Sequence, residues 1–172
     1  VVSPTTAIEI GRLGGVGVLN LEGLWTRYED ADSILAEIAE QPAEKATERM
    51  QELYQQPIIP SLVTERIQEI NDAGVVSCAS VTPQRTNEML EHILAGELDM
   101  LVIQGTVVSA EHVSTTTEPL NLKTFIRQLD IPVIVGGCAT NKAALHLMRT
   151  GAAGVLVGVG PGHACTTRSV LG

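Results

Sequence analysis

Five short apolar runs, each followed by a stretch with helical spacing, constrain the fold of this chain more than any other feature. Each run is continuous and rich in β-branched residues, which is typical of parallel strands buried on both faces. An alternating pattern would instead indicate a sheet with one solvated face. The sequence therefore predicts an α/β fold on a parallel sheet, with strands at residues 16–20, 75–81, 100–104, 133–135 and 155–157.

The segments between these runs contain helix start and stop signals. Ser3 and Pro4 suit an N-cap followed by the first helical position. Thr82-Pro83 and Gly96 bracket a second predicted helix in the same way. Further helices are expected over residues 118–130 and 140–151, and an acidic helical excursion, broken near Pro42, over residues 31–56.

The regular strand–helix repeat suits either a (β/α)8 TIM barrel or a doubly wound sheet. A barrel needs about eight strands, and five parallel strands on their own would have two open edges. We therefore expect the chain to cover roughly strands 2–6 of a (β/α)8 barrel, truncated at both ends. Residues 1–172 would form one partial catalytic barrel domain. A complete five-stranded, flavodoxin-like domain is the alternative fold.

Charge and composition argue against several classes of protein. The net charge of −9 disfavours a nucleic-acid-binding protein, which needs a basic surface. The longest uncharged runs are shorter than the ~20 residues of a membrane-spanning helix, so no membrane association is expected. Cys78, Cys138 and Cys165 are odd in number and widely spaced, which argues against a disulfide framework or a structural zinc site. A reducing, cytoplasmic location fits best.

In a barrel, the reacting groups lie where strands end and the following helices begin. Glycines and polar residues are concentrated at these junctions, as expected where a backbone approaches a ligand closely. The opposite junctions contain only ordinary helix caps and turns. The sequence thus predicts an active face formed by residues 20–23, 80–83, 103–106, 135–140 and 158–168.

The junction GVGPGHACTTR, residues 158–168, contains the strongest candidate for a nucleophile. Cys165 follows a glycine-rich loop and precedes a predicted helix, whose dipole lowers a thiol pKa and favours the thiolate. Thr166 and Thr167 add hydroxyl groups within the same turn. A small, buried structural cysteine is the alternative interpretation of Cys165.

This junction also resembles the active-site cysteine loop of the IMP dehydrogenase/GMP reductase family. VIVGGCAT at residues 133–140 and ALHLMRTGAAGVLVGVGPG at residues 144–162 resemble the two barrel strands that lead into that loop. VVSPTTAIEIGRLGGVGVL at residues 1–19 resembles the family's first helix and second strand. The chain is most similar to the bacterial IMP dehydrogenase-related proteins that lack the regulatory insert.

The resemblance implies a purine-nucleotide oxidoreductase that converts IMP to XMP with NAD. Cys165 matches the cysteine that attacks C2 of the purine ring, and Thr167 matches the threonine that positions the adduct. A GMP reductase, which converts GMP to IMP with NADPH, is the alternative. The backbone carbonyls of Gly160, Gly162 and Cys165 match the ligands of a monovalent cation, K+ in many members.

The resemblance also implies particular contacts with substrate and cofactor, and the chain departs from the common family pattern at three of them. Gln104 replaces an Asp that holds the nicotinamide ribose, His163 replaces a phosphate-binding Ser, and Cys138 replaces a frequent Asn. An amide cannot offer a carboxylate to two ribose hydroxyls, so a changed dinucleotide affinity is expected. The implied cofactor contacts are Gln104, Gly105 and Cys138, and the implied substrate contacts are Gly136, Gly137, Gly162, His163 and Thr166.

Two functions of other classes remain open on the sequence. A catalytically silent, nucleotide-binding paralogue would not need the Cys165-Thr166-Thr167 triplet, and a flavin-binding barrel would not need Cys165. The resemblance further implies a homo-oligomer, a tetramer at full length. Because the first barrel strand and the late phosphate-binding loops are missing, we expect the 172-residue chain alone to be inactive.

Overall fold

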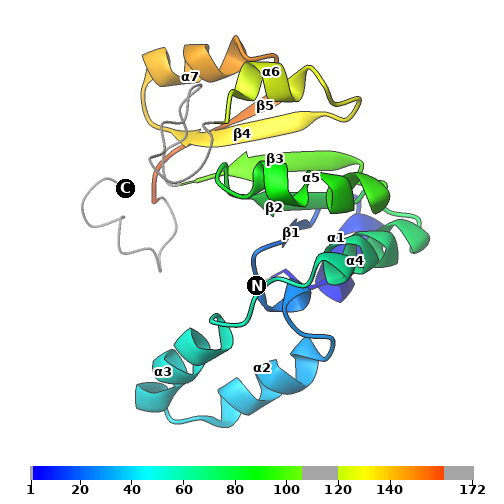
Figure 1. The fold of residues 1–172 in the computed structure, drawn as a ribbon, viewed down its shortest axis with the longest axis vertical. Helices are drawn as coiled ribbons and strands as arrows, with labels where there is room; N and C mark the ends of the chain where they lie inside the picture. Colours follow the sequence, from blue (N-terminus) through cyan, green and yellow to red (C-terminus); the bar gives the residue numbers. More distant parts are fainter. Residues whose placement is uncertain (1, 106–119, 161–172) are drawn as a thin grey trace. The chain divides into compact units, whose positions relative to one another are not determined.

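A computed structural model of the chain describes residues 2–105 and 120–160 (Figure 1). Helices and strands alternate along the described chain, which confirms the predicted α/β class. The strands are β1 (Val18–Asn20), β2 (Cys78–Val81), β3 (Met100–Gln104), β4 (Val133–Cys138) and β5 (Gly154–Val157). The helices are α1 (Pro4–Arg12), α2 (Ala31–Glu40), α3 (Ala43–Leu53), α4 (Pro60–Asp72), α5 (Thr86–Ala95), α6 (Leu122–Ile126) and α7 (Asn141–Met148), with a 3-10 turn, η1, at Leu24–Thr26.

The strands follow one another in the sheet in chain order, β1-β2-β3-β4-β5. β2 pairs with β3, β3 with β4 and β4 with β5, all in parallel. In a flavodoxin-like sheet β1 would lie between β2 and β3, so the direct β2–β3 pairing rules out that alternative. A sequential parallel array with intervening helices is the arrangement of a (β/α) barrel segment.

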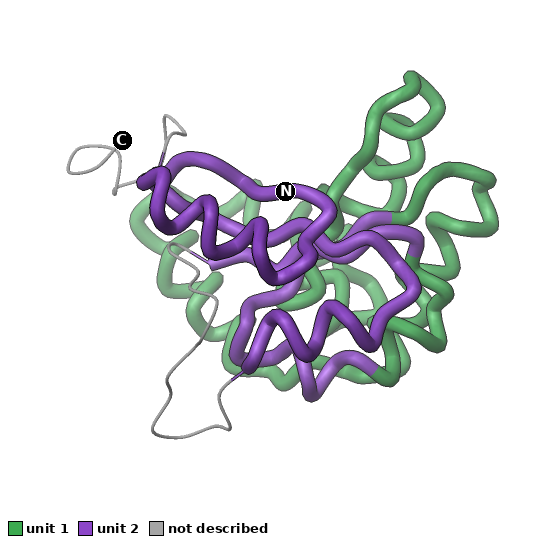
Figure 2. The backbone as a smooth tube through the Cα atoms, turned by 90° about the horizontal axis from the view of Figure 1, so that it is seen from above, with its two compact units in different colours: residues 1–77, 91–98 green, residues 78–90, 99–172 purple. Residues whose placement is uncertain are grey.

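Contacts divide the chain into two compact units, shown in different colours in Figure 2. Unit 1 comprises residues 1–77 and 91–98, and unit 2 comprises residues 78–90 and 99–172. Helix α5 therefore begins in unit 2 and ends in unit 1. None of the helices within the described ranges is long and apolar enough to cross a membrane.

In unit 1, α4 has an apolar face whose spacing follows the helical period, with Leu62, Val63, Ile67 and Ile70 all buried. A Cβ added at Gly96, just after α5, would lie 2.8 Å from Cβ of Ile67. Glycine is therefore needed where the end of α5 approaches α4.

In unit 2, α6 and α7 lie on the same side of β4 and β5 in Figure 1. Their N-caps are of the expected kind: Oδ1 of Asn121 accepts from the Thr124 N–H at 3.1 Å, and Oγ1 of Thr140 accepts from the Ala143 N–H at 3.2 Å. Leu122, Phe125 and Ile126 are buried, so even the short α6 contributes to the core of this unit.

Several predicted boundaries were wrong. The helix expected to begin at Thr82-Pro83 begins at Thr86, because the Thr82 carbonyl accepts from the Arg85 N–H at 3.1 Å and the Thr86 hydroxyl at 2.8 Å in a preceding turn. The helix expected over residues 118–130 covers only Leu122–Ile126, and the strand expected at residues 133–135 extends to Cys138. Helix α4, with Pro60 at its start, was not predicted. The break near Pro42 between two acidic helices is confirmed.

Candidate functional site

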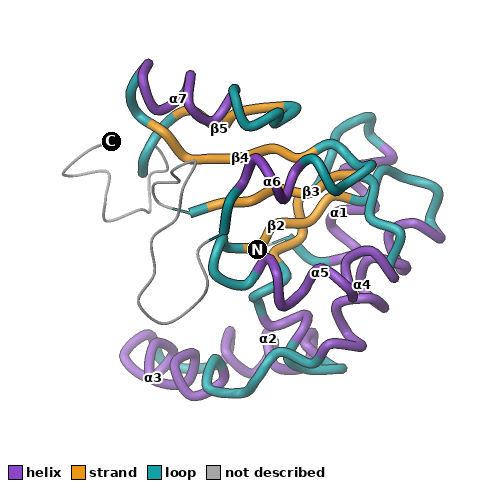
Figure 3. The backbone as a smooth tube through the Cα atoms, turned by 45° about the horizontal axis from the view of Figure 1, so that its top comes forward, coloured by secondary structure: helices purple, strands orange, loops and turns teal. Residues whose placement is uncertain are grey.

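The ends of β3 and β4 bring four of the predicted contact residues together. Figure 3 shows these strands running side by side, and their register places Gln104 opposite Gly136. The Gly105 N–H donates to the Gly136 carbonyl at 2.9 Å, and the Gly137 N–H donates to the Gly105 carbonyl at 3.0 Å. The predicted cofactor contacts Gln104 and Gly105 and the predicted substrate contacts Gly136 and Gly137 are therefore neighbours across one strand pair.

Gly136 is the residue of this group with the strictest steric requirement. A Cβ at Gly136 would lie 2.5 Å from Cβ of Leu156 and 2.7 Å from the Leu156 carbonyl oxygen. Because one of these atoms belongs to the backbone of β5, no side-chain rotation could make room. The close approach of β4 and β5 thus depends on glycine at this position.

A bulge in β4 follows directly after Gly136. Gly136 pairs with Leu156 and Cys138 with Val157, so no residue of β5 lies opposite Gly137. The Gly137 N–H bonds to Gly105 on the other side instead. The extra residue redirects the end of β4, and bulges of this kind are frequent next to functional sites.

Cys138 and Gln104 differ in accessibility. Cys138 is 1% exposed, and its thiol is 3.6 Å from the Leu156 carbonyl oxygen, to which it donates. The Gln104 side chain, by contrast, is exposed at the end of β3. In this structure the amide of Gln104 is therefore open to a ligand, whereas the thiol of Cys138 is directed at β5.

The loop after β5 begins with two glycines in conformations that other residues rarely adopt. Gly158 and Gly160 have φ values of 121° and 62°, in the region that favours glycine. The Gly158 N–H donates to the Cys138 carbonyl at 2.7 Å, which ties the start of this loop to the end of β4. The remaining predicted residues of the loop, Gly162, His163, Cys165, Thr166 and Thr167, lie outside the described residues.

The described part of the chain holds no cluster of three or more His, Cys, Asp or Glu side chains suited to a metal ion. Of the backbone carbonyls predicted to bind a monovalent cation, only that of Gly160 falls within the described residues. The cation site therefore stays a prediction.

Cys78 opens β2 and is 1% exposed. Burial raises the pKa of its thiol to about 11. Because the thiolate is the nucleophilic form of cysteine, Cys78 is a poor nucleophile at neutral pH.

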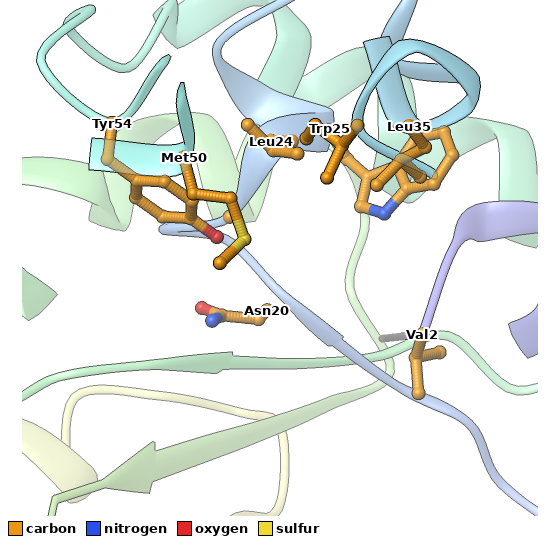
Figure 4. A pocket seen from close by; sticks show the side chains of 9 residues that line it. Val2, Asn20, Leu24, Trp25, Leu35, Met50 and Tyr54 are labelled. Atoms are coloured by element: carbon orange, nitrogen blue, oxygen red, sulfur yellow. The ribbon is translucent and has the colours of Figure 1, made fainter. Parts of the chain in front are cut away.

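The sequence did not predict a cavity of about 440 Å³ in unit 1. Figure 4 shows the side chains that line it, among them Asn20 at the end of β1 and Tyr54 after α3. One available signal was the placement of the aromatic residues. Only 2% of the sequence is aromatic, yet Trp25, Tyr28 and Tyr54 all lie between the first two strands.

Comparison with known proteins gives a consistent result over the whole chain. Residues 1–172 match the family model described as IMP dehydrogenase / GMP reductase domain. The chain is 49% identical over 177 residues to a Mycobacterium tuberculosis protein named as an uncharacterized oxidoreductase, covering 99% of this chain and 47% of that protein. It is 35% identical over 104 residues to an inosine-5'-monophosphate dehydrogenase of Borreliella burgdorferi, covering 60% of this chain and 25% of that enzyme.

Among solved structures, the chain resembles that of an IMP dehydrogenase/GMP reductase-like protein from Corynebacterium glutamicum. The TM-score is 0.84 at 44% sequence identity, covering 92% of this chain and 43% of the other. The chain thus spans about half the length of the curated relatives that it matches over nearly its full extent.

Proposed function

Since this chain belongs to the IMP dehydrogenase/GMP reductase family, with a fold that is part of a (β/α) barrel, we propose that its full-length protein oxidises IMP to XMP with NAD. The observation that carries this proposal is the family match over residues 1–172, which includes the loop with Cys165. The parallel array supports it, because consecutive strand ends share one edge of the sheet, as barrel active sites require.

Cys165 is the proposed nucleophile. Its thiolate adds to C2 of the purine, and loss of hydride from C2 leaves a covalent thioimidate on the sulfur. Water then adds to C2, the carbon–sulfur bond breaks, and XMP leaves with the thiol restored. Thr167 positions the adduct and the attacking water. Dividing the reaction into two steps lowers the barrier of each.

The substrate-binding residues would act mainly through their backbones. Gly136 and Gly137 are buried at the end of β4 and carry no side chain that could keep a purine nucleotide at a distance. Gly162, His163 and Thr166 would complete this site, with the His163 ring donating a hydrogen bond to the nucleotide phosphate.

The proposed dinucleotide site comprises Gln104 and Gly105. Cys138, the third predicted contact, lies beside them, but its thiol is buried against Leu156 and offers the dinucleotide no side-chain contact in this structure. The exposed amide of Gln104 fits ribose hydroxyls, because it offers both a donor and an acceptor. NAD, when bound, supplies the acceptor for the hydride. The carbonyls of Gly160, Gly162 and Cys165 would hold K+, and we propose a homotetramer for the full-length protein.

The second candidate function is GMP reductase activity with NADPH, and the residue that favours it is Gln104. The amide replaces the carboxylate that a family dehydrogenase commonly presents to the nicotinamide ribose, so the dinucleotide preference is open to change.

The assay that tests both candidates uses the full-length protein with K+. We expect IMP and NAD to yield XMP and NADH. Consumption of NADPH with GMP, and no reaction with IMP, would favour the reductase. Nucleotide binding by calorimetry without turnover in either direction would contradict both proposals and favour a silent paralogue.

We expect Gln104→Asp to lower the KM for the dinucleotide about fivefold, because a carboxylate makes charge-assisted hydrogen bonds that are roughly twice as strong as those of an amide. Steady-state kinetics with varied NAD and NADPH would measure this. Gln128→Asp, which adds the same charge at another exposed glutamine of unit 2, is the control and should leave KM unchanged. Equal KM values in Gln104→Asp and the parent would contradict the assigned role.

A further inference from the structure

The cavity in unit 1 has the composition of a small-molecule site. Its volume of about 440 Å³ lies within the range of ligand pockets. The walls are apolar or aromatic, and no lining side chain carries a charge at neutral pH. The lining residues are Val2, Asn20, Gly23, Leu24, Trp25, Leu35, Ile38, Met50 and Tyr54.

Three polar groups border this apolar space. Oδ1 of Asn20 accepts from the Glu22 N–H at 2.9 Å, which orients the amide and leaves Nδ2 as a donor. The indole nitrogen of Trp25 and the hydroxyl of Tyr54 border the same cavity in Figure 4. Within residues 2–105 and 120–160, none of these three donors has a hydrogen-bond acceptor.

The walls of the cavity are held in place from outside. The Arg49 guanidinium on α3 bonds to Glu37 on α2 at 2.8 Å and to Glu52 at 3.1 Å. The Tyr28 hydroxyl donates to the Leu53 carbonyl at 3.0 Å. These contacts join α2, α3 and the segment after β1 around the cavity.

Two arginines contact the aromatic residues of the wall, one at the Tyr54 ring and one at the Trp25 backbone. The guanidinium of Arg27 lies 5.3 Å from the centre of the Tyr54 ring, a cation–π contact. Arg66 on α4 donates through Nε to the Trp25 carbonyl at 3.1 Å and through Nη2 to the Glu29 carbonyl at 2.6 Å. The Tyr54 ring, held by Arg27, and the Trp25 ring, whose backbone is held by Arg66, are surfaces on which a flat molecule could stack.

These observations together define the ligand chemistry. We propose that this cavity binds an uncharged, planar heteroaromatic molecule whose ring nitrogen or carbonyl oxygen accepts a hydrogen bond from Asn20 Nδ2. A charged ligand would lose its water without gaining a counter-ion, and a purely aliphatic one would leave the donors without acceptors. The proposed site includes none of the residues assigned to the purine nucleotide or the dinucleotide.

Quinoline and naphthalene are suitable probes, because they have the same shape and differ by one ring nitrogen. Trp25 is the one tryptophan of this sequence, so its indole N–H gives a single, directly assigned signal in a ¹⁵N-correlated NMR spectrum of the chain. At mildly alkaline pH, where quinoline is uncharged, we expect quinoline to shift this signal saturably. The Kd of quinoline should be about fivefold below that of naphthalene, because one net hydrogen bond of about 1 kcal/mol changes a Kd by about this factor.

Two variants test separately how the hydrogen bond and the apolar wall contribute to probe binding. Asn20→Asp keeps the acceptor for the Glu22 N–H but removes the donor, so quinoline should lose its advantage over naphthalene. Met50→Glu places a charge in the wall and should abolish binding of both probes. Leu94→Glu is the matched control, because Leu94 is 47% exposed, close to the 42% of Met50, and lies outside the cavity.

Several results would overturn the proposal: no saturable shift with quinoline, equal affinity for the two probes, or equal loss of binding in Leu94→Glu and Met50→Glu. A concentration-dependent dimer that Met50→Glu dissociates would also overturn it, since the cavity would then be covered by a second copy of the chain. Leu35→Glu changes another half-exposed position of the wall and should also abolish binding of both probes. This second variant ensures that the result does not depend on whether Met50→Glu folds.

Discussion

Replacing Cys165 by alanine in the full-length protein is expected to lower kcat by a factor on the order of 10⁴ or more, as removal of a covalent nucleophile does in other enzymes. Without the sulfur, no thioimidate can form and hydride has no route from C2. Binding of IMP should change little, because the thiol contributes mainly to the covalent steps. Turnover and nucleotide affinity would be measured separately, by dinucleotide absorbance and by calorimetry.

Cys78→Ala is the control for this variant. Cys78 is buried in β2, its pKa is raised to about 11, and it belongs to no proposed site, so turnover should persist. Iodoacetamide should modify Cys165 first, and bound IMP or GMP should protect it. Preferential labelling of Cys138, or near-normal turnover in Cys165→Ala, would show that the reactive centre lies elsewhere.

Gly136→Ala should have the largest effect on stability. Its Cβ would fall 2.5 Å and 2.7 Å from two atoms of Leu156, so β4 and β5 would have to separate. Forcing extra atoms into a packed interior typically costs about 1–3 kcal/mol, and we expect a loss of free energy of unfolding at the upper end of that range. Urea denaturation followed by circular dichroism would measure it.

Gly154→Ala provides a matched comparison on the neighbouring strand. A Cβ at Gly154 would have its nearest neighbour, Cγ1 of Ile134, at 3.4 Å, an ordinary contact. The free energy of unfolding of this variant should stay within about 0.5 kcal/mol of the parent, or rise slightly, because alanine loses less backbone entropy than glycine on folding. Equal stability of the Gly136 and Gly154 variants would mean that β4 and β5 do not approach as closely as described.

Local signals in the sequence were sufficient for most of the fold. The continuous apolar runs around Leu101 and Val133 indicated buried parallel strands, since both faces of such strands pack against other elements. Ser3 was recognisable as an N-cap because capping involves only residues a few positions apart. The edge of the sheet at which Gln104 and Gly136 meet also followed, because parallel strands all end on the same side.

Tertiary contacts decided the features that depend on residues far apart in the chain. The bulge at Gly137 arises because β4 pairs with different registers on its two sides, which no local pattern encodes. Burial of the Cys138 thiol against Leu156 likewise depends on a strand 18 residues away. The cavity beside Asn20 likewise could not be predicted from local patterns, since its walls come from segments that include β1, α2 and α3, and an ion pair joins α2 to α3. Local spacing therefore predicted most of the elements and the direction of the strands, whereas the distances between the elements, and hence the shape of each site, were set by packing.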